Sequence, residues 1–230
     1  MNSISMIVKV GRALPPGPCF RETFLILFLC AASCLAADPV LISLKENDTA
    51  VLILDRERAD HSRPEVVIAP SQSPGRVIVE RRIDPDPKDW TEVRWVIRFD
   101  LAKAATSFRQ AKLHLWCQGT AGSPKVAPKL ELIQTTDLQR IVSQDRASQP
   151  LLPNAVEIPF PSTAQMIEID VTAQIQETVK RKLPFAAFRI SAVCDKPECA
   201  GKEPQNFYFG GSTNVWSWPQ SEAPMLEITP

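Results

Sequence analysis

The sequence has little glycine, almost no histidine and no excess charge of either sign. Its 230 residues include 8 glycines and 2 histidines, and 26 basic side chains balance 26 acidic ones. Proteins that bind nucleic acid need a strongly basic surface, so zero net charge argues against nucleic acid as a partner. With only His61 and His114, the chain offers few bases that titrate near neutral pH.

The sequence also lacks the common catalytic motifs. It contains no nucleophile elbow, no glycine-rich phosphate loop and no HExxH pattern, and Tyr208 is the only tyrosine that lyase-type chemistry could use. A glycosidase that uses a pair of carboxylates stays an open alternative, because the sequence does not give the distance between any two carboxylates. We therefore predict a protein that binds rather than catalyses.

An apolar run near the start is too short for a transmembrane helix, which needs about 20 apolar residues. This run, Phe24–Ala32, precedes the small residues Ser33, Ala36 and Ala37. Three basic side chains come before it: Lys9, Arg12 and Arg21. This order is typical of a secretory signal.

We accordingly predict a signal peptide over residues 1–37 and one mature domain over residues 38–230. The mature chain would carry no transmembrane span and would be secreted or held in the cell envelope, in the periplasm or at the outer surface. An uncleaved anchor helix is one alternative. A lipoprotein is another, with the lipid on Cys34.

Three cysteines remain in the predicted mature chain. Cys194 and Cys199 flank a four-residue loop that contains Pro197. Exported proteins can keep disulfides, so we predict a Cys194–Cys199 bridge and a buried, unpaired Cys117. A zinc site is the alternative, but it lacks a fourth ligand and the usual paired spacing.

Proline is abundant, at 21 residues, and divides the chain into short segments. Each proline removes a backbone donor, so long helices are disfavoured. We predict eleven strands: Val40–Leu44, Ala50–Leu54, Val66–Ala69, Val77–Ile83, Val93–Phe99, Ala111–Gln118, Lys129–Gln134, Met166–Val171, Phe185–Val193, Asn206–Phe209 and Met225–Ile228.

Several of these segments alternate between apolar and polar side chains. Over residues 93–99 one face takes Val93, Trp95, Ile97 and Phe99, and the other takes Arg94, Val96 and Arg98. Such alternation is typical of strands with one buried and one solvated face. Many such strands without intervening helices predict an all-β fold, a jelly-roll-like antiparallel β-sandwich.

One short helix is predicted near residues 172–183, lying over an open end of the sandwich. Thr172 can cap it, and Pro184 can end it. Its apolar face takes Ile175, Val179 and Leu183, and Glu177 and Arg181 form an i, i+4 pair. Residues 135–161 are the least regular part of the chain, and we predict a long surface excursion there.

Two sets of segments follow one another along the chain: Arg94–Leu101 followed by Ala111–Leu115, and Glu168–Thr172 followed by Ile175 and Gln176. The first set resembles the central signature of the DNRLRE-type domain, and the second is similar to another motif of that family. The resemblance runs in order from about Leu41 to Thr229. It implies an exported β-sandwich close to carbohydrate-binding modules, some of which bind alginate or other polysaccharides.

Tryptophans are the first candidates for binding such a ligand, because aromatic rings stack on the apolar faces of sugars. Trp116 falls on the polar face of a predicted strand. Trp216 and Trp218 lie two residues apart in a loop, and in an extended segment both rings would point the same way. The alternative is that these rings cap the rim of the core.

Four basic side chains form the second candidate: Arg94, Arg98, Lys112 and His114. If the strands over 93–99 and 111–118 pair, all four share one face with Trp116. Such a cationic stripe would suit the carboxylate or sulfate groups of an anionic polysaccharide. The alternative is a solvated face on which these cations pair with acids such as Glu168 and Asp170.

A turn with alternating carboxylates is the third candidate. Asp84, Asp86 and Asp89 offer the oxygen ligands that Ca²⁺ prefers, although the glycine and bidentate glutamate of an EF-hand loop are absent. A polar turn stiffened by proline is the stronger interpretation. Apart from this possible structural calcium, we predict no cofactor.

The sequence therefore predicts a secreted, non-catalytic module that binds a polysaccharide, which we expect to be anionic if the basic stripe forms. A structural or adhesive protein of the cell envelope, acting through protein contacts, is the alternative. A small extracellular carbohydrate-active enzyme is the third.

Overall fold

A computed structural model describes nine stretches of the chain: residues 38–45, 48–55, 65–69, 77–83, 90–104, 107–121, 127–192, 205–210 and 223–230. They belong to one compact unit, Ala37–Pro230. The predicted signal peptide and the predicted Cys194–Cys199 bridge lie outside these residues.

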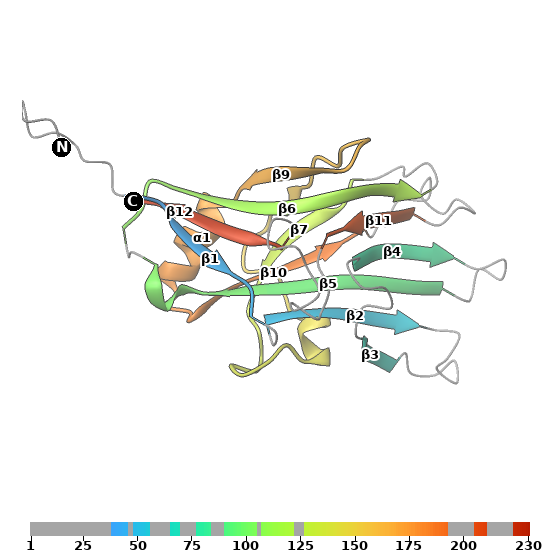
Figure 1. Ribbon diagram of the computed structural model, residues 1–230. Coiled ribbons are helices and arrows are strands. Elements are labelled where there is room, and N and C mark those ends of the chain that lie inside the picture. The colour runs from blue at the N-terminus through green and yellow to red at the C-terminus, as the bar shows by residue number, and fades with distance from the viewer. Residues whose placement is uncertain are drawn as a thin grey trace, which may run out of the picture. The chain divides into compact units, whose positions relative to one another are not determined.

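The described residues form twelve strands and one α-helix (Figure 1). The first six strands are β1 (Val40–Ser43), β2 (Thr49–Asp55), β3 (Glu65–Ala69), β4 (Val77–Ile83), β5 (Trp90–Asp100) and β6 (Gln110–Ala121). The others are β7 (Lys129–Ile133), β8 (Val156–Glu157), β9 (Gln165–Asp170), β10 (Phe185–Ser191), β11 (Gln205–Phe209) and β12 (Met225–Thr229), with α1 (Thr172–Lys180) between β9 and β10. All eleven predicted strands are present, and only the two-residue β8 was not predicted.

The strands pair antiparallel throughout and form two layers. One layer has the order β1-β12-β6-β9, and the other has the order β3-β2-β5-β10-β7-β8. Strands β11 and β4 connect β6 to β5, so the hydrogen-bonded sheet curls around one side of the core. This arrangement confirms the predicted all-β sandwich.

The main core lies between the two layers and uses the predicted apolar faces. Trp95 and Phe99 of β5, Leu115 of β6 and Phe188 of β10 are fully buried there. The indole of Trp95 donates a 2.9 Å hydrogen bond to Thr49 Oγ1, which satisfies its one buried donor. Alternation along each strand therefore identified the side chains that fill the core.

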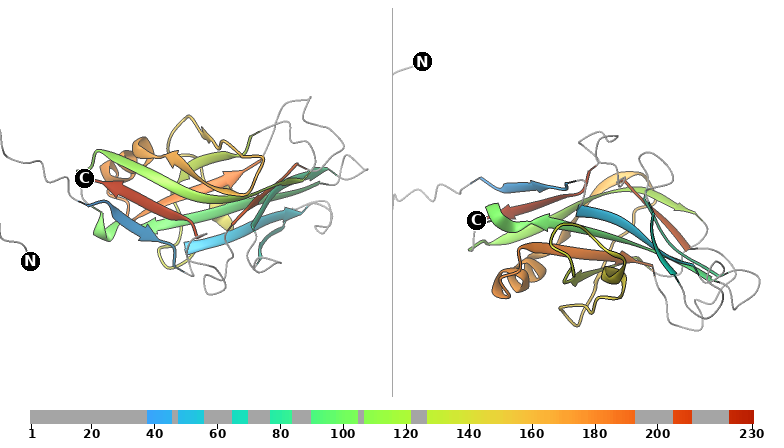
Figure 2. Two further views of the ribbon diagram at one scale, coloured as in Figure 1. Left: turned by 45° about the horizontal axis from the view of Figure 1, so that its top comes forward. Right: turned by 90° about the horizontal axis from the view of Figure 1, so that it is seen from below.

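The helix α1 contacts β6 in one layer and β10 in the other, so it covers one end of the sandwich, as predicted (Figure 2). Ile175 on its inner face is fully buried. The predicted ion pair between Glu177 and Arg181 forms, with Arg181 Nε 2.6 Å from Glu177 Oε1.

The predicted cap of this helix is wrong. Thr172 is the first helical residue, and its N–H donates to Asp170 Oδ1 at 2.9 Å. The Thr172 hydroxyl instead accepts the N–H of Ala111, 3.0 Å away on β6, which ties the helix to that strand. The Thr172 hydrogen bonds also lower the pKa of Asp170, since they favour its charged form.

The segment predicted as a surface excursion is in fact partly buried. Residues 134–150 lie over the second face of the layer that contains β5, where Ile141 packs with Leu52, Val96 and Ala187. A 3-10 helix (Ser143–Ala147) within it buries Asp145 completely. Strands β2, β5, β10 and β7 therefore contribute to apolar clusters on both faces.

Cys117 is fully buried in the main core, in agreement with its predicted role as a small apolar side chain. Burial raises the pKa of its thiol to about 12. The thiolate is the reactive form, so we expect iodoacetamide to leave Cys117 unmodified in the folded protein at about pH 8. Peptide mass spectrometry would show full modification after unfolding in guanidinium; rapid labelling of the folded protein would contradict the burial.

In the part of the chain that the structure describes, no helix combines the length and the apolar character needed to cross a membrane.

Candidate functional site

The predicted cationic stripe does not form, because its two strands do not pair. β5 pairs with β2, β4 and β10, whereas β6 pairs with β9, β11 and β12. Arg94 and Arg98 therefore belong to one layer, and Lys112, His114 and Trp116 belong to the other. The prediction of one shared face was wrong, since alternation places side chains on a face but does not choose the neighbouring strand.

On β6, each basic side chain of the predicted stripe lies beside a carboxylate of a neighbouring strand. Lys112 Nζ is 2.8 Å from Glu168 Oε2 on β9, and His114 Nε2 is 2.9 Å from Glu227 Oε2 on β12. The hydrogen bond between Lys112 and Glu168 raises the pKa of Lys112 and lowers the pKa of Glu168. These are the paired surface charges that the sequence offered as the alternative.

The outward face of β6 is acidic rather than basic. Asp170 lies opposite Lys112 in the register with β9, and it joins the two glutamates already named. Lys112 and His114 thus face three carboxylates, and this acidic excess disfavours an anionic ligand there. Trp116 is half-buried on this face, opposite Met166.

Arg94 belongs to a cluster of charges beneath residues 141–148. Glu92 pairs with Arg94 and, at 3.0 Å, with Arg146. Arg94 and Arg189 each donate to the main-chain oxygen of Arg146, at 3.0 and 2.7 Å, and Arg189 lies 2.7 Å from Glu131. These bonds fasten the segment to β5 and β10, which gives Arg94 a structural role.

Arg98 is the most buried basic side chain of the predicted stripe, with 1% of its surface exposed. Its Nε lies 2.6 Å from Asp48 Oδ1, and its Nη1 donates to the main-chain oxygen of Asp137 at 2.7 Å. Its Nη2 donates to the main-chain oxygen of Leu138 at 3.3 Å, and its guanidinium lies 4.3 Å from the centre of the Phe185 ring. All three nitrogens of Arg98 are therefore bound within the protein.

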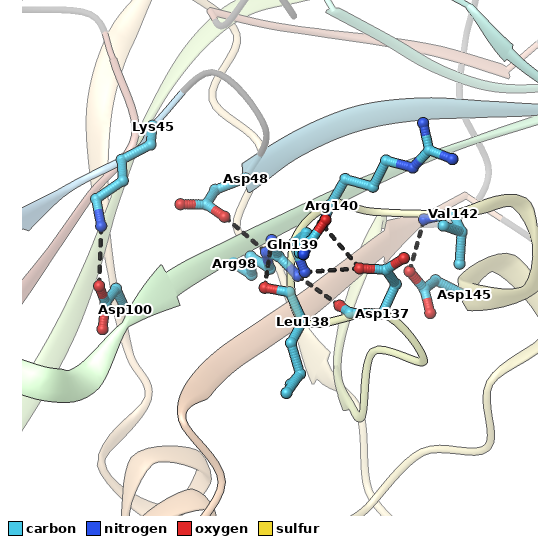
Figure 3. Close-up of polar contacts among 10 residues, drawn as sticks. All are labelled: Lys45, Asp48, Arg98, Asp100, Asp137, Leu138, Gln139, Arg140, Val142 and Asp145. Atoms are coloured by element: carbon cyan, nitrogen blue, oxygen red, sulfur yellow. Dashed lines mark hydrogen bonds and ion pairs between the residues drawn. The ribbon is translucent and has the colours of Figure 1, made fainter.

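A surface pocket of about 340 Å³ opens beside Arg98. Its lining comes from four segments of the chain: Lys45 and Asp48 after β1, Arg98 and Asp100 at the end of β5, Leu138 and Gln139 after β7, and Phe185 at the start of β10. Six of these seven residues are drawn in Figure 3. The pocket volume is near the lower end of the range for small-ligand sites.

The outer part of the pocket carries a second ion pair. Lys45 Nζ donates to Asp100 Oδ2 at 2.8 Å, and 68% of the Lys45 side chain is exposed (Figure 3). The bond to Asp100 raises the pKa of Lys45 above its ordinary value. The main-chain N–H of Asp48 donates to the main-chain oxygen of Lys45 at 3.0 Å, so the two lining residues of this segment are held in one turn.

The wall formed by Leu138 and Gln139 is fixed by a carboxylate at its start. Asp137 Oδ1 accepts the N–H groups of Gln139 at 2.6 Å and Arg140 at 3.2 Å, and these bonds lower the pKa of Asp137. An aspartate that accepts the N–H two residues on is a common device for shaping a turn. Leu138 is left 64% exposed at the pocket.

Sequence reasoning named Arg98 but missed the rest of this pocket. Asp48 lies in the loop between two predicted strands, and Phe185 starts a strand 87 positions after Arg98. No spacing motif links these positions. The one available signal was Arg98 itself, an arginine on a strand whose other face is entirely apolar.

The remaining predicted site residues lie outside the described residues. They are Trp216 and Trp218, the carboxylates Asp84, Asp86 and Asp89, and the cysteine pair. Among the residues that are described, no group of three or more His, Cys, Asp and Glu side chains is arranged to hold a metal ion.

Comparison of the chain with models of known protein families gives no match, and comparison with curated proteins gives none either.

Proposed function

We propose that this protein is an exported, non-catalytic β-sandwich that binds a polysaccharide in the pocket beside Arg98. The observation that carries the proposal is the composition of the pocket. Leu138 and Phe185 provide an apolar wall, and Lys45, Asp48 and Gln139 provide hydrogen-bonding groups around it. Sugars have apolar C–H faces and peripheral hydroxyls, so a site of this mixed character suits them.

The sequence supports the same proposal independently of the pocket. Its resemblance to the DNRLRE-type domain implies a relative of carbohydrate-binding modules, and the N-terminal segment has the order of a secretory signal. A β-sandwich alone does not imply a ligand, because one fold hosts many functions. The pocket, rather than the fold, therefore carries the functional argument.

A binding role suits the pocket better than hydrolysis. Its two carboxylates, Asp48 and Asp100, each lie beside a cation of the chain, at 2.6 and 2.8 Å. A glycosidase needs one carboxyl group that donates a proton and a second that attacks or activates water. The proton-donating group needs surroundings that keep it protonated, and neither Asp48 nor Asp100 has them, because each faces a cation.

Leu138→Ala is expected to weaken binding about tenfold, because it removes apolar surface that a sugar would cover. Leu41→Ala is the matched control, since Leu41 is 56% exposed on β1 and does not line the pocket. Binding to an array of plant, bacterial and algal glycans, followed by titration calorimetry with the best ligand, measures both variants.

The proposal is contradicted if both leucine variants lose the same affinity for the glycan, or if the wild type retains no glycan. In the second case the structural or adhesive role becomes the better interpretation. Trp116→Ala tests the other layer: binding that depends on Trp116 and not on Leu138 would move the site to the outward face of β6.

A further inference from the structure

The charges that line the pocket are balanced within the protein. Arg98 is matched by Asp48, and Lys45 by Asp100. With two cations and two carboxylates, the described residues of the lining have no net charge to offer an ion. We propose that the pocket takes an uncharged sugar unit, neither a uronic acid nor an amino sugar with a free amine; this inference rests on the proposed function.

Arg98 is poorly placed to bind an anionic ligand. Its side chain is 1% exposed, and three of its five N–H groups already donate to Asp48 or to a carbonyl of the covering segment. A ligand carboxylate would have to lose its own water to reach the two N–H groups that remain. Such a transfer is unfavourable, because removing a charged group from water costs more than removing a hydroxyl.

Among the described residues of the pocket lining, Lys45 is the only exposed cation, and it already forms an ion pair with Asp100. A ligand carboxylate that binds Lys45 would lie beside the Asp100 carboxylate, so attraction to one group is offset by repulsion from the other. The same argument applies with reversed sign to a ligand amine near Asp100 and Lys45. Formal charge on the ligand therefore brings little net gain at either residue.

Hydroxyl groups, in contrast, find complementary partners. Among the described residues, Asp48 uses Oδ1 for Arg98, which leaves Oδ2 as an acceptor at the pocket. The Lys45 ammonium has three N–H donors, and one of them donates to Asp100. Gln139 is exposed and adds an amide with both a donor and an acceptor.

The closing experiment compares three oligosaccharide sets on one array: neutral hexoses, uronic acids, and hexosamines with free amines. We expect retention by neutral chains only, with affinity nearly unchanged between roughly 0.05 and 0.5 M salt, because screening weakens only ionic attraction. Preference for uronic acids or free amines, with affinity that falls in salt, would overturn the inference and leave polysaccharide binding standing. Retention of no sugar would overturn the proposed function itself.

Variants of Lys45 test the same point with one ligand. Lys45→Ala removes a donor and should weaken binding of a neutral sugar about fivefold, whereas Lys45→Gln keeps an N–H donor and should lose clearly less affinity. If charge is what binds the ligand, Lys45→Gln will lose as much affinity as Lys45→Ala. Lys112→Ala is the matched control, because Lys112 forms an equally short exposed pair, at 2.8 Å, on the other layer.

Discussion

Replacing Asp48 by alanine is expected to lower the free energy of unfolding by about 3–5 kcal/mol, the usual effect of removing one partner of a buried ion pair. Arg98 and Asp48 are 1% and 6% exposed at their side chains, and Nε and Oδ1 are 2.6 Å apart. Without the carboxylate, the guanidinium would stay buried with only main-chain carbonyls as acceptors. Urea unfolding followed by tryptophan fluorescence measures the loss.

Two comparisons make this test specific. Lys45→Ala lies in the same turn but removes an exposed charge, so its unfolding curve should nearly overlay that of the wild type. The double variant Asp48→Leu with Arg98→Met replaces both charges by apolar side chains, and it should be more stable than Asp48→Ala alone. An Asp48→Ala protein with wild-type stability would show that Arg98 is not buried as described.

Asp145→Ala is expected to lower the free energy of unfolding by at least about 3 kcal/mol, because its carboxylate accepts three hydrogen bonds and bonds to a charged group contribute about 1.5–3 kcal/mol each. Its fully buried carboxylate accepts the N–H of Thr136 at 2.8 Å, the Thr136 hydroxyl at 2.6 Å and the N–H of Val142 at 2.9 Å. These three bonds close residues 136–142 into a loop. Asp145→Asn keeps one carbonyl acceptor and should lose less.

The same variant tests whether the covering loop shapes the pocket. Leu138 and Gln139 lie within residues 136–142, so loosening the loop should weaken glycan binding although Asp145 does not line the pocket. Hydrogen exchange measured by mass spectrometry should show faster exchange over residues 136–142 and unchanged exchange in β6. Full protection of the loop in Asp145→Ala would refute this role for the carboxylate.

Two arginines, of which Arg98 is buried and Arg94 is half-buried, explain why the second face of β5 was misread. Arg94 and Arg98 alternate with Val96, a pattern that normally indicates a solvated face. Apart from Glu92, which pairs with Arg94 from two positions away, their partners are distant in sequence: Asp48 is 50 positions from Arg98, and the Arg146 carbonyl is 52 positions from Arg94. A charged side chain can be buried only where such partners come together in the fold, and the sequence of the strand does not show where the distant partners are.

The sequence by itself determined the strands, the helix and the side chains of the main core. Local rules suffice for these features, because the two-residue period of a strand and the i, i+4 spacing of a helix are properties of neighbouring residues. The apolar faces of β5, β6 and β10 were therefore predicted correctly, together with the Glu177–Arg181 pair.

Only the tertiary structure decided which strands are neighbours and where a ligand can bind. Alternation is the same for every possible partner strand, so it did not show that β5 and β6 lie in different layers. The pocket combines four segments between Lys45 and Phe185, and the same folding pairs its charges. The residues of the predicted basic stripe therefore lie in two different environments. Lys112 and His114 pair with carboxylates on the outer side of one layer, and Arg98 is buried among acceptors from distant parts of the chain.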